Sequence, residues 1–156
     1  MTDLLTFLPF SPEHADDFKA LNIEWLEFFF VVEPIDELVL SKPMEQIIAP
    51  GGFIFMTALE QQVMGTFAFI KKGNKTYEFS KMAIAPPFRG KGYGNQMMQF
   101  AIRFAEQHHW DKLLIYSSTL LENAIYLYRK YGFVEVPMEA NPIYSRGDIK
   151  MELELR

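Results

Sequence analysis

Strand-like segments follow one another in the middle of the chain. Residues 53–59, 63–70 and 76–84 are rich in apolar, β-branched and aromatic side chains, which is typical of strands. The polar residues at 60–61 and 71–75 suit tight turns between these segments. The pattern therefore predicts three consecutive strands that pair as an antiparallel meander.

A helical pattern precedes the strands. Apolar side chains recur every three or four positions, which predicts a helix over roughly 12–30 that Ser11 can cap. Pro34 interrupts the pattern, and a second, shorter helix is expected to end before Pro43. A further helical turn is expected over 43–48.

The second half of the chain alternates between helical and strand patterns. Gly132 stands where a helix end needs a left-handed residue, and apolar and charged residues alternate in the last segment. The predicted elements are a helix over 93–108, a strand over 113–116, a helix over 122–131, a strand over 133–136 and a closing strand over 149–156. This order predicts an α+β fold around a mixed sheet.

Composition excludes several kinds of chemistry. The 156 residues are 49% hydrophobic and 22% charged, which is a globular composition that fits one domain. Cysteine is absent, which excludes disulfides, thiolate metal sites and a cysteine nucleophile. The histidines His14, His108 and His109 match no ligand spacing, so no metal is expected, and the adjacent pair suits a helix end. No secretory signal or apolar run of about 20 residues stands out, so we expect a soluble, cytoplasmic protein.

Charge is distributed unevenly along the chain. The net charge is −5, but residues 1–70 hold two basic and eleven acidic side chains. Six basic residues and one acidic residue lie between Lys71 and Lys91. Such a division suits an anionic ligand on one half and a cationic ligand on the other, although two solvated faces of opposite sign would give the same counts. The overall acidity argues against nucleic acid as a partner.

The most informative segment is RGKGYG at 89–94, between a predicted strand and a predicted helix. Its alternating glycines let backbone N–H groups approach a ligand, and the helix start and two basic side chains add positive charge. These features predict a pyrophosphate-binding turn, with a ligand-free glycine-rich turn as the alternative. A P-loop is excluded by spacing, and Asn95 stands where a dinucleotide fingerprint needs its third glycine.

The motif R-x-x-G-x-G at 89–94 resembles the phosphate-binding motif of the GNAT superfamily of N-acetyltransferases. Residues 77–84 lead into it as the family's fourth strand does, and residues 123–133 resemble the family's N-x-x-A-x-x-x-Y-x-x-x-G-F region. The resemblance covers about 50–156. It implies a mixed, mostly antiparallel sheet of six to seven strands flanked by about four helices, with one domain over 1–156.

The resemblance implies acetyl-CoA as co-substrate, bound by residues 51–156 in a gap where the fourth and fifth strands separate. The fourth strand would bind the pantetheine arm through its backbone, and the glycine turn would bind the pyrophosphate. Asn123, at the start of the helix predicted over 122–131, would contact the pantetheine arm, although an asparagine there also suits a helix cap. The residues implied are Met82, Ala83, Ile84, Arg89, Gly90, Lys91, Gly92, Tyr93, Gly94, Asn95 and Asn123.

Two catalytic candidates follow from the resemblance. Tyr128 would be the general acid that protonates the departing thiolate, since a phenol keeps its proton at neutral pH; a packed core aromatic is the alternative. Glu78 would be the general base that takes a proton from the incoming amine, directly or through water. A solvent-facing strand glutamate is the alternative for Glu78.

The acceptor side is expected in the helical segment 1–50. Trp25, Phe29, Glu33 and Asp36 could form an aromatic and acidic mouth for a cationic amine, although helical spacing also suits core positions. The resulting hypothesis is acetyl transfer to a small-molecule, peptide or lysine amine, with a non-catalytic acyl-CoA sensor as the alternative. Neither a membrane nor nucleic acid is expected as partner, and a homodimer stays open because family members often pair through sheet edges.

Overall fold

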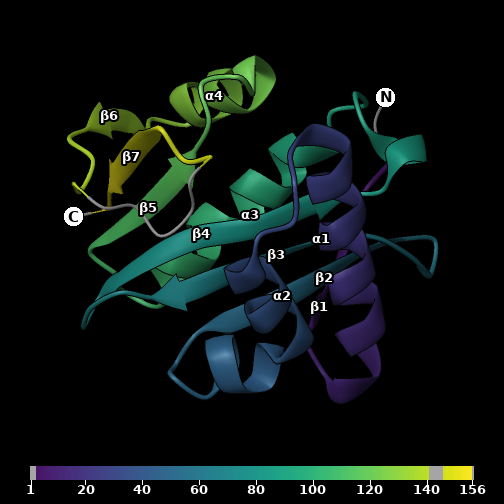
Figure 1. Ribbon diagram of the computed structural model, residues 1–156. Helices are drawn as coiled ribbons and strands as arrows, with labels where there is room; N and C mark the ends of the chain where they lie inside the picture. Colours follow the sequence, from purple (N-terminus) through teal and green to yellow (C-terminus); the bar gives the residue numbers. More distant parts are fainter. Residues whose placement is uncertain (1–2, 141–145, 156) are drawn as a thin grey trace.

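The computed structural model describes residues 3–140 and 146–155. Seven strands form one sheet in the order β1-β2-β3-β4-β5-β7-β6, and every neighbouring pair is antiparallel except β4 and β5 (Figure 1). Their bounds are Thr6–Pro9 (β1), Phe53–Leu59 (β2), Gln62–Lys71 (β3), Thr76–Ile84 (β4), Lys112–Ser117 (β5), Val134–Val136 (β6) and Ile149–Glu154 (β7). The predicted α+β class and the mixed, mostly antiparallel sheet are confirmed.

The central meander of β2, β3 and β4 matches the prediction closely. Glu60 and Gln61 join β2 to β3 with φ angles of 50° and 71°, which is the left-handed geometry of a tight hairpin turn. β3 lies between β2 and β4, and its side chains are buried over most of its length. This strand therefore forms the centre of the sheet.

The strand β1 was not predicted. It spans only Thr6–Pro9 and lies at the sheet edge, paired with β2 through Thr6 opposite Ala58 and Pro9 opposite Phe55. Four residues that end in proline give no reliable alternation, and proline is tolerated because an edge strand can do without one hydrogen bond. These four residues are a strand because they pair with β2, and the local sequence does not indicate that pairing.

Helices cover both faces of the sheet (Figure 1). Helices α1 and α2 lie in front of it, and α3 lies behind. The helices are α1 (Ala15–Phe29), α2 (Pro34–Ser41), α3 (Tyr93–Gln107) and α4 (Glu122–Lys130), with short helical turns at Pro12–His14, Met44–Ile48 and Pro86–Phe88. The predicted first helix therefore begins with a 3-10 turn. His108 ends α3 and bonds the Phe104 carbonyl at 2.8 Å, which confirms the expected helix-end position.

Two hydrophobic clusters hold these layers together. The larger packs α3 and Tyr128 against one face of the sheet, with Phe67 and Phe69 of β3 fully buried. The smaller packs Phe18 and Leu26 of α1 against the other face. Within the described residues, no helix is long and apolar enough to cross a membrane. Arg156, the last residue of the predicted closing strand, lies outside the described residues.

β4 and β5 run side by side for only a short distance. Their parallel pairing is confined to Thr76–Glu78 of β4 and Lys112–Leu114 of β5. Beyond it β4 continues to Ile84 along β3, and β5 continues to Ser117 along β7. Among the described residues, the two strands therefore separate where β4 approaches the glycine turn, as the resemblance implies.

Candidate active site

A cavity of about 600 Å³ occupies the gap between β4 and β5. Its lining includes residues 78–84 of β4, residues 115–117 of β5 and Ser118 after that strand, and also parts of α1, α4 and the glycine turn. This volume lies within the usual range for small-molecule sites. The separation of the two strands therefore produces a site that elements from both halves of the chain complete.

The glycine turn has the backbone geometry that the motif predicted. Gly90 and Gly92 have φ angles of 73° and 85°, and Gly92 is the N-cap residue of α3. A Cβ at Gly90 would meet nothing within 4 Å, whereas one at Gly94 would lie 3.4 Å from Met82 Cε. Gly90 and Gly94 both line the cavity, so a ligand can approach the main chain and the start of α3 there.

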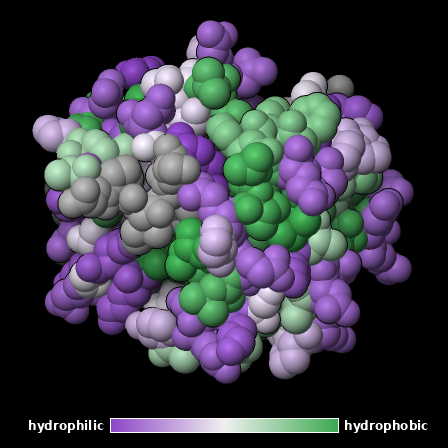
Figure 2. Space-filling model, viewed as in Figure 1, coloured by the Kyte–Doolittle hydropathy of each residue, from purple (hydrophilic) through white to green (hydrophobic). Residues whose placement is uncertain are grey.

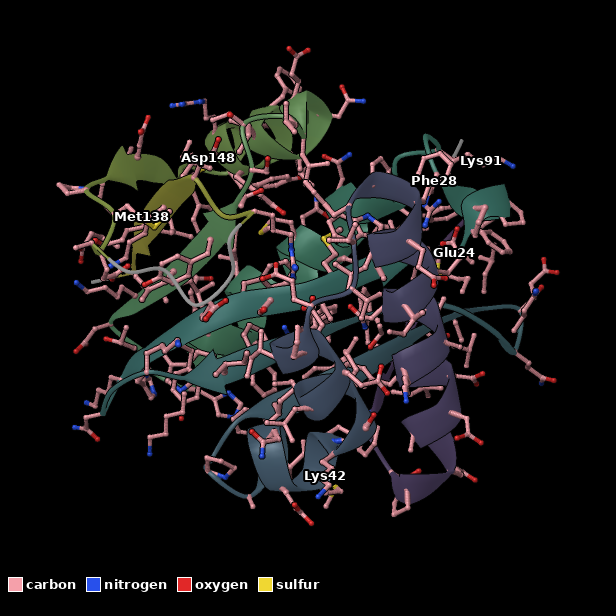
Figure 3. All side chains as sticks on the ribbon, in the orientation of Figure 1. Glu24, Phe28, Lys42, Lys91, Met138 and Asp148 are labelled. Atoms are coloured by element: carbon pink, nitrogen blue, oxygen red, sulfur yellow. The ribbon has the colours of Figure 1, made fainter. Side chains whose placement is uncertain are left out.

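Arg89 of the motif lies against α1. Its guanidinium forms an ion pair with Glu24 and lies 5.3 Å from the ring centre of Phe28 and 5.5 Å from that of Phe29. Figure 3 shows Glu24 and Phe28 beside the loop that carries Lys91. The buried Nε of Arg89 has no partner among the described residues. Arg89 therefore joins the glycine turn to α1.

Other predicted cofactor residues divide into two groups. Asn123 and the β4 residues Met82, Ala83 and Ile84 line the cavity. The N-cap of α4 is Leu121, so Asn123 is not a cap. Four residues do not line the cavity: Tyr93 is buried in the core, Lys91 and Gly92 are exposed, and the Asn95 Oδ1 accepts hydrogen bonds from Lys130 and Tyr131.

Tyr128 is buried beside the cavity. It packs against Phe133, with 6.2 Å between ring centres, and its side chain lines the cavity wall. Burial raises the pKa of Tyr128 to about 12. The residue is therefore a core aromatic that keeps its phenolic proton beside the gap between the strands, and its role as general acid stays a prediction.

Glu78 lies on the opposite part of the same lining, and only 7% of it is exposed. Its Oε1 is 3.4 Å from Lys72 Nζ. Tyr77 and Phe79 belong to the cluster behind the sheet, so alternation directs Glu78 toward α1 and α2. The structure therefore contradicts a solvent-facing Glu78 and brings this carboxylate and Tyr128 to one cavity.

The predicted aromatic and acidic mouth is only partly present. Trp25, Phe29 and Asp36 line the cavity, and an apolar area covers the end of α1 in Figure 2. Asp36, however, is completely buried, and Arg146 donates hydrogen bonds of 2.9 and 2.8 Å to its two carboxylate oxygens. Arg146 also bonds Glu33 at 3.0 Å. These two acids are therefore engaged in an internal ion pair.

Three charged residues of the site were missed: Glu24, Lys81 and Arg146. Lys81 offered a signal, since strict alternation would place it with Tyr77 and Phe79 behind the sheet, where a lysine is out of place. Arg146 offered none, because its partner Asp36 lies 110 positions away in the sequence. Glu24 was counted only among the acidic residues of the first half.

Comparisons with known proteins agree with this geometry. The family model described as an acetyltransferase (GNAT) domain matches residues 50–135. No curated protein matches the chain. A GNAT-family acetyltransferase from Staphylococcus aureus Mu50 has a similar structure, with a TM-score of 0.85 and 16% identity over 98% of this chain and 100% of that one.

Two structurally similar proteins were solved with ligands. Spermidine N-acetyltransferase from Vibrio cholerae, in complex with CoA and spermine, has a TM-score of 0.76 and 20% identity over 97% of this chain and 95% of that one. A GNAT-family acetyltransferase from Elizabethkingia anophelis with acetyl-CoA bound has a TM-score of 0.66 and 21% identity over 98% and 99% of the two chains. These likenesses establish the fold.

Proposed function

This chain belongs to the GNAT acetyltransferase family, and from that premise we propose that it transfers an acetyl group from acetyl-CoA to a primary amine. The amine attacks directly, within a ternary complex of enzyme and both substrates. One observation carries the proposal: a single cavity runs between the separated strands and is lined by the glycine turn, by Tyr128 and by α1. Both substrates can therefore meet inside it.

The cofactor end lies at the glycine turn. Gly90 and Gly94 present main-chain N–H groups at the start of α3, where an anionic diphosphate is favoured. The edge of β4 from Met82 to Ile84 faces the gap and can hydrogen-bond the pantetheine amides as an added strand would. When bound, acetyl-CoA supplies the activated thioester.

Tyr128 stabilises the leaving sulfur. Since its pKa is about 12, the phenol stays protonated at any physiological pH. A thiol has an ordinary pKa of about 8.5, so the phenol is the weaker acid, and full transfer of its proton to a thiolate would be unfavourable. Tyr128 therefore acts chiefly as a hydrogen-bond donor to the developing negative charge, and the proton that ends on the thiol comes from the attacking amine.

Glu78 removes a proton from the incoming ammonium, directly or through water. Its burial beside the cavity and its position on the α1 side of β4 support this role. The Lys72 Nζ lies 3.4 Å from its Oε1, so the carboxylate stands at the cavity wall beside a cation. Attack then proceeds on a thioester oriented by the surrounding main chain, which supplies most of the rate gain.

The test measures CoA release from acetyl-CoA across a panel of small amines, peptides and lysine derivatives. For Tyr128→Phe we expect kcat to fall on the order of 10²-fold, with CoA affinity by calorimetry unchanged. Tyr126→Phe is the matched control, because Tyr126 is 71% exposed on the same helix. Tight CoA binding without turnover on any amine would instead support a non-catalytic acyl-CoA sensor, and absence of CoA binding would refute both functions.

A further inference from the structure

The strand β4 contains one extra residue opposite β3. Ser80 pairs with Ala68 and Ala83 pairs with Thr66, so Lys81 and Met82 together face the single residue Phe67. This is a β-bulge, and the φ of Lys81 is 55°, a left-handed conformation that costs a lysine of order 1 kcal/mol or more.

The bulge turns Lys81 toward the acceptor side of the cavity. Met82 keeps to the α3 side, since a Cβ at Gly94 would lie 3.4 Å from Met82 Cε. Lys81 lines the cavity, and its electrostatic neighbours include Glu78, Asp36, Arg146 and Lys72. Regular alternation would place the Lys81 side chain behind the sheet. The bulge instead brings it near Asp36, at the start of α2.

The charges around Lys81 balance one another. Among the residues that the structure describes, three cations (Lys72, Lys81, Arg146) lie among three carboxylates (Glu33, Asp36, Glu78). Arg146 is engaged by two of these acids, and Lys72 lies beside the third. A polyamine would therefore bring uncompensated positive charge to this end of the cavity.

The environment of Lys81 favours an additional anion. Burial lowers the pKa of Lys81 to about 8, and the Glu78 and Asp36 carboxylates offset only part of that effect. At neutral pH Lys81 is mostly charged, and its half-buried side chain lines the cavity. A carboxylate on a ligand in the cavity can accept a charge-assisted hydrogen bond from it.

We propose that Lys81 binds a carboxylate carried by the acceptor, so that the acceptor is an amino acid or a similar primary amine with its own carboxylate. Such a zwitterion keeps the site electrically balanced, with its amine toward Glu78 and its carboxylate on Lys81. Trp25, Leu26 and Leu40 also line the cavity, which favours an apolar side chain. The inference rests on the proposed acetyl transfer and names its acceptor.

The test compares leucine and phenylalanine with their carboxamides, and with spermidine. We expect kcat/KM for the amino acids to exceed that for the carboxamides roughly tenfold or more. The amine of a carboxamide has the lower pKa, which by itself would favour the carboxamide, so the expected order cannot arise from amine basicity. Lys81→Gln should abolish the preference and Lys81→Arg should keep it. Lys71→Gln, an exposed lysine of β3, is the matched control.

Calorimetry in the presence of CoA separates this inference from the proposed function. Binding of leucine or phenylalanine that is weakened by Lys81→Gln and not by Lys71→Gln supports the carboxylate site, even if no acetyl transfer follows and the proposed function fails. Equal binding of acids and carboxamides, or faster acetylation of spermidine, would overturn the inference while leaving acetyl transfer to amines in place.

Discussion

Replacement of Asp36 by asparagine tests the ion pair that joins α2 to Arg146. Asp36 is completely buried and accepts two hydrogen bonds from the guanidinium and one of 2.9 Å from the Glu33 backbone N–H. Asparagine has nearly the same shape but offers one acceptor oxygen and no charge. Breaking a buried pair on one side costs about 3–5 kcal/mol. Arg146 keeps its contact with Glu33, so we expect the lower end, about 3 kcal/mol.

Urea unfolding followed by tryptophan fluorescence at pH 7 measures this loss. Asp36→Asn should lower the free energy of unfolding and shift the midpoint without changing the slope. Glu37→Gln is the matched control, because Glu37 lies on the same helix and pairs with Lys19 in an exposed ion pair. The midpoint of Glu37→Gln should stay near that of the wild type.

The same comparison has a defined pH dependence. Burial alone raises the pKa of Asp36, but hydrogen bonds from Arg146 and the Glu33 backbone outweigh it and hold the pKa below its ordinary value of 3.8. A lowered carboxyl pKa stabilises the protein above the unfolded value, and the contribution is lost as pH falls through the folded pKa. The difference between wild type and Asp36→Asn should therefore close below pH 3.8. A loss under about 1 kcal/mol at pH 7, against the 3–5 expected for a buried pair, would refute the reasoning.

Two further substitutions probe the glycine turn and the sheet. Glu24→Gln should strengthen CoA binding roughly threefold at low salt, because it removes the negative charge that pairs with Arg89. Calorimetry measures the affinity. An unchanged affinity, or the same gain from Glu27→Gln at an exposed position of the same helix, would contradict this. Gly52→Ala should cost about 2–3 kcal/mol in urea unfolding, because its Cβ would clash with the backbone carbonyl oxygens of Phe69 and Ile47. Gly73→Ala should be nearly neutral, because a Cβ at Gly73 would have its nearest neighbour 3.7 Å away. Equal losses of unfolding free energy in the two variants would exclude the steric explanation.

Local patterns were sufficient to predict most of the fold. The meander, the main helices and the closing strand each carry alternation or helical spacing, together with turn residues such as Glu60-Gln61, and these signals act within a few positions of one another. The strand β1 carries no such signal because its four residues become a strand only by pairing with β2.

The site was predictable where backbone geometry decides it, and less so where side chains meet across the fold. The predicted tight turn contains Gly90 and Gly92 in left-handed conformations, which no other residue type adopts as readily. The partners of Arg89, Asp36 and Asn95 could not be inferred, since each lies on an element remote in sequence. The composition shows that the first half of the chain is acidic. It could not indicate that Arg146 pairs with two of those acids, Glu33 and Asp36.

The extra residue in β4 also affects how this site could vary between related chains. If Lys81 were deleted, Ser80 and Ala83 could keep their partners on β3, with Met82 alone opposite Phe67. One codon lost from the gene would then remove a cation from the cavity without moving the ends of the strand. The number of residues in β4, more than their chemical type, would decide whether a relative carries a charge there. A sequence alignment that scores only aligned positions would overlook that difference in charge.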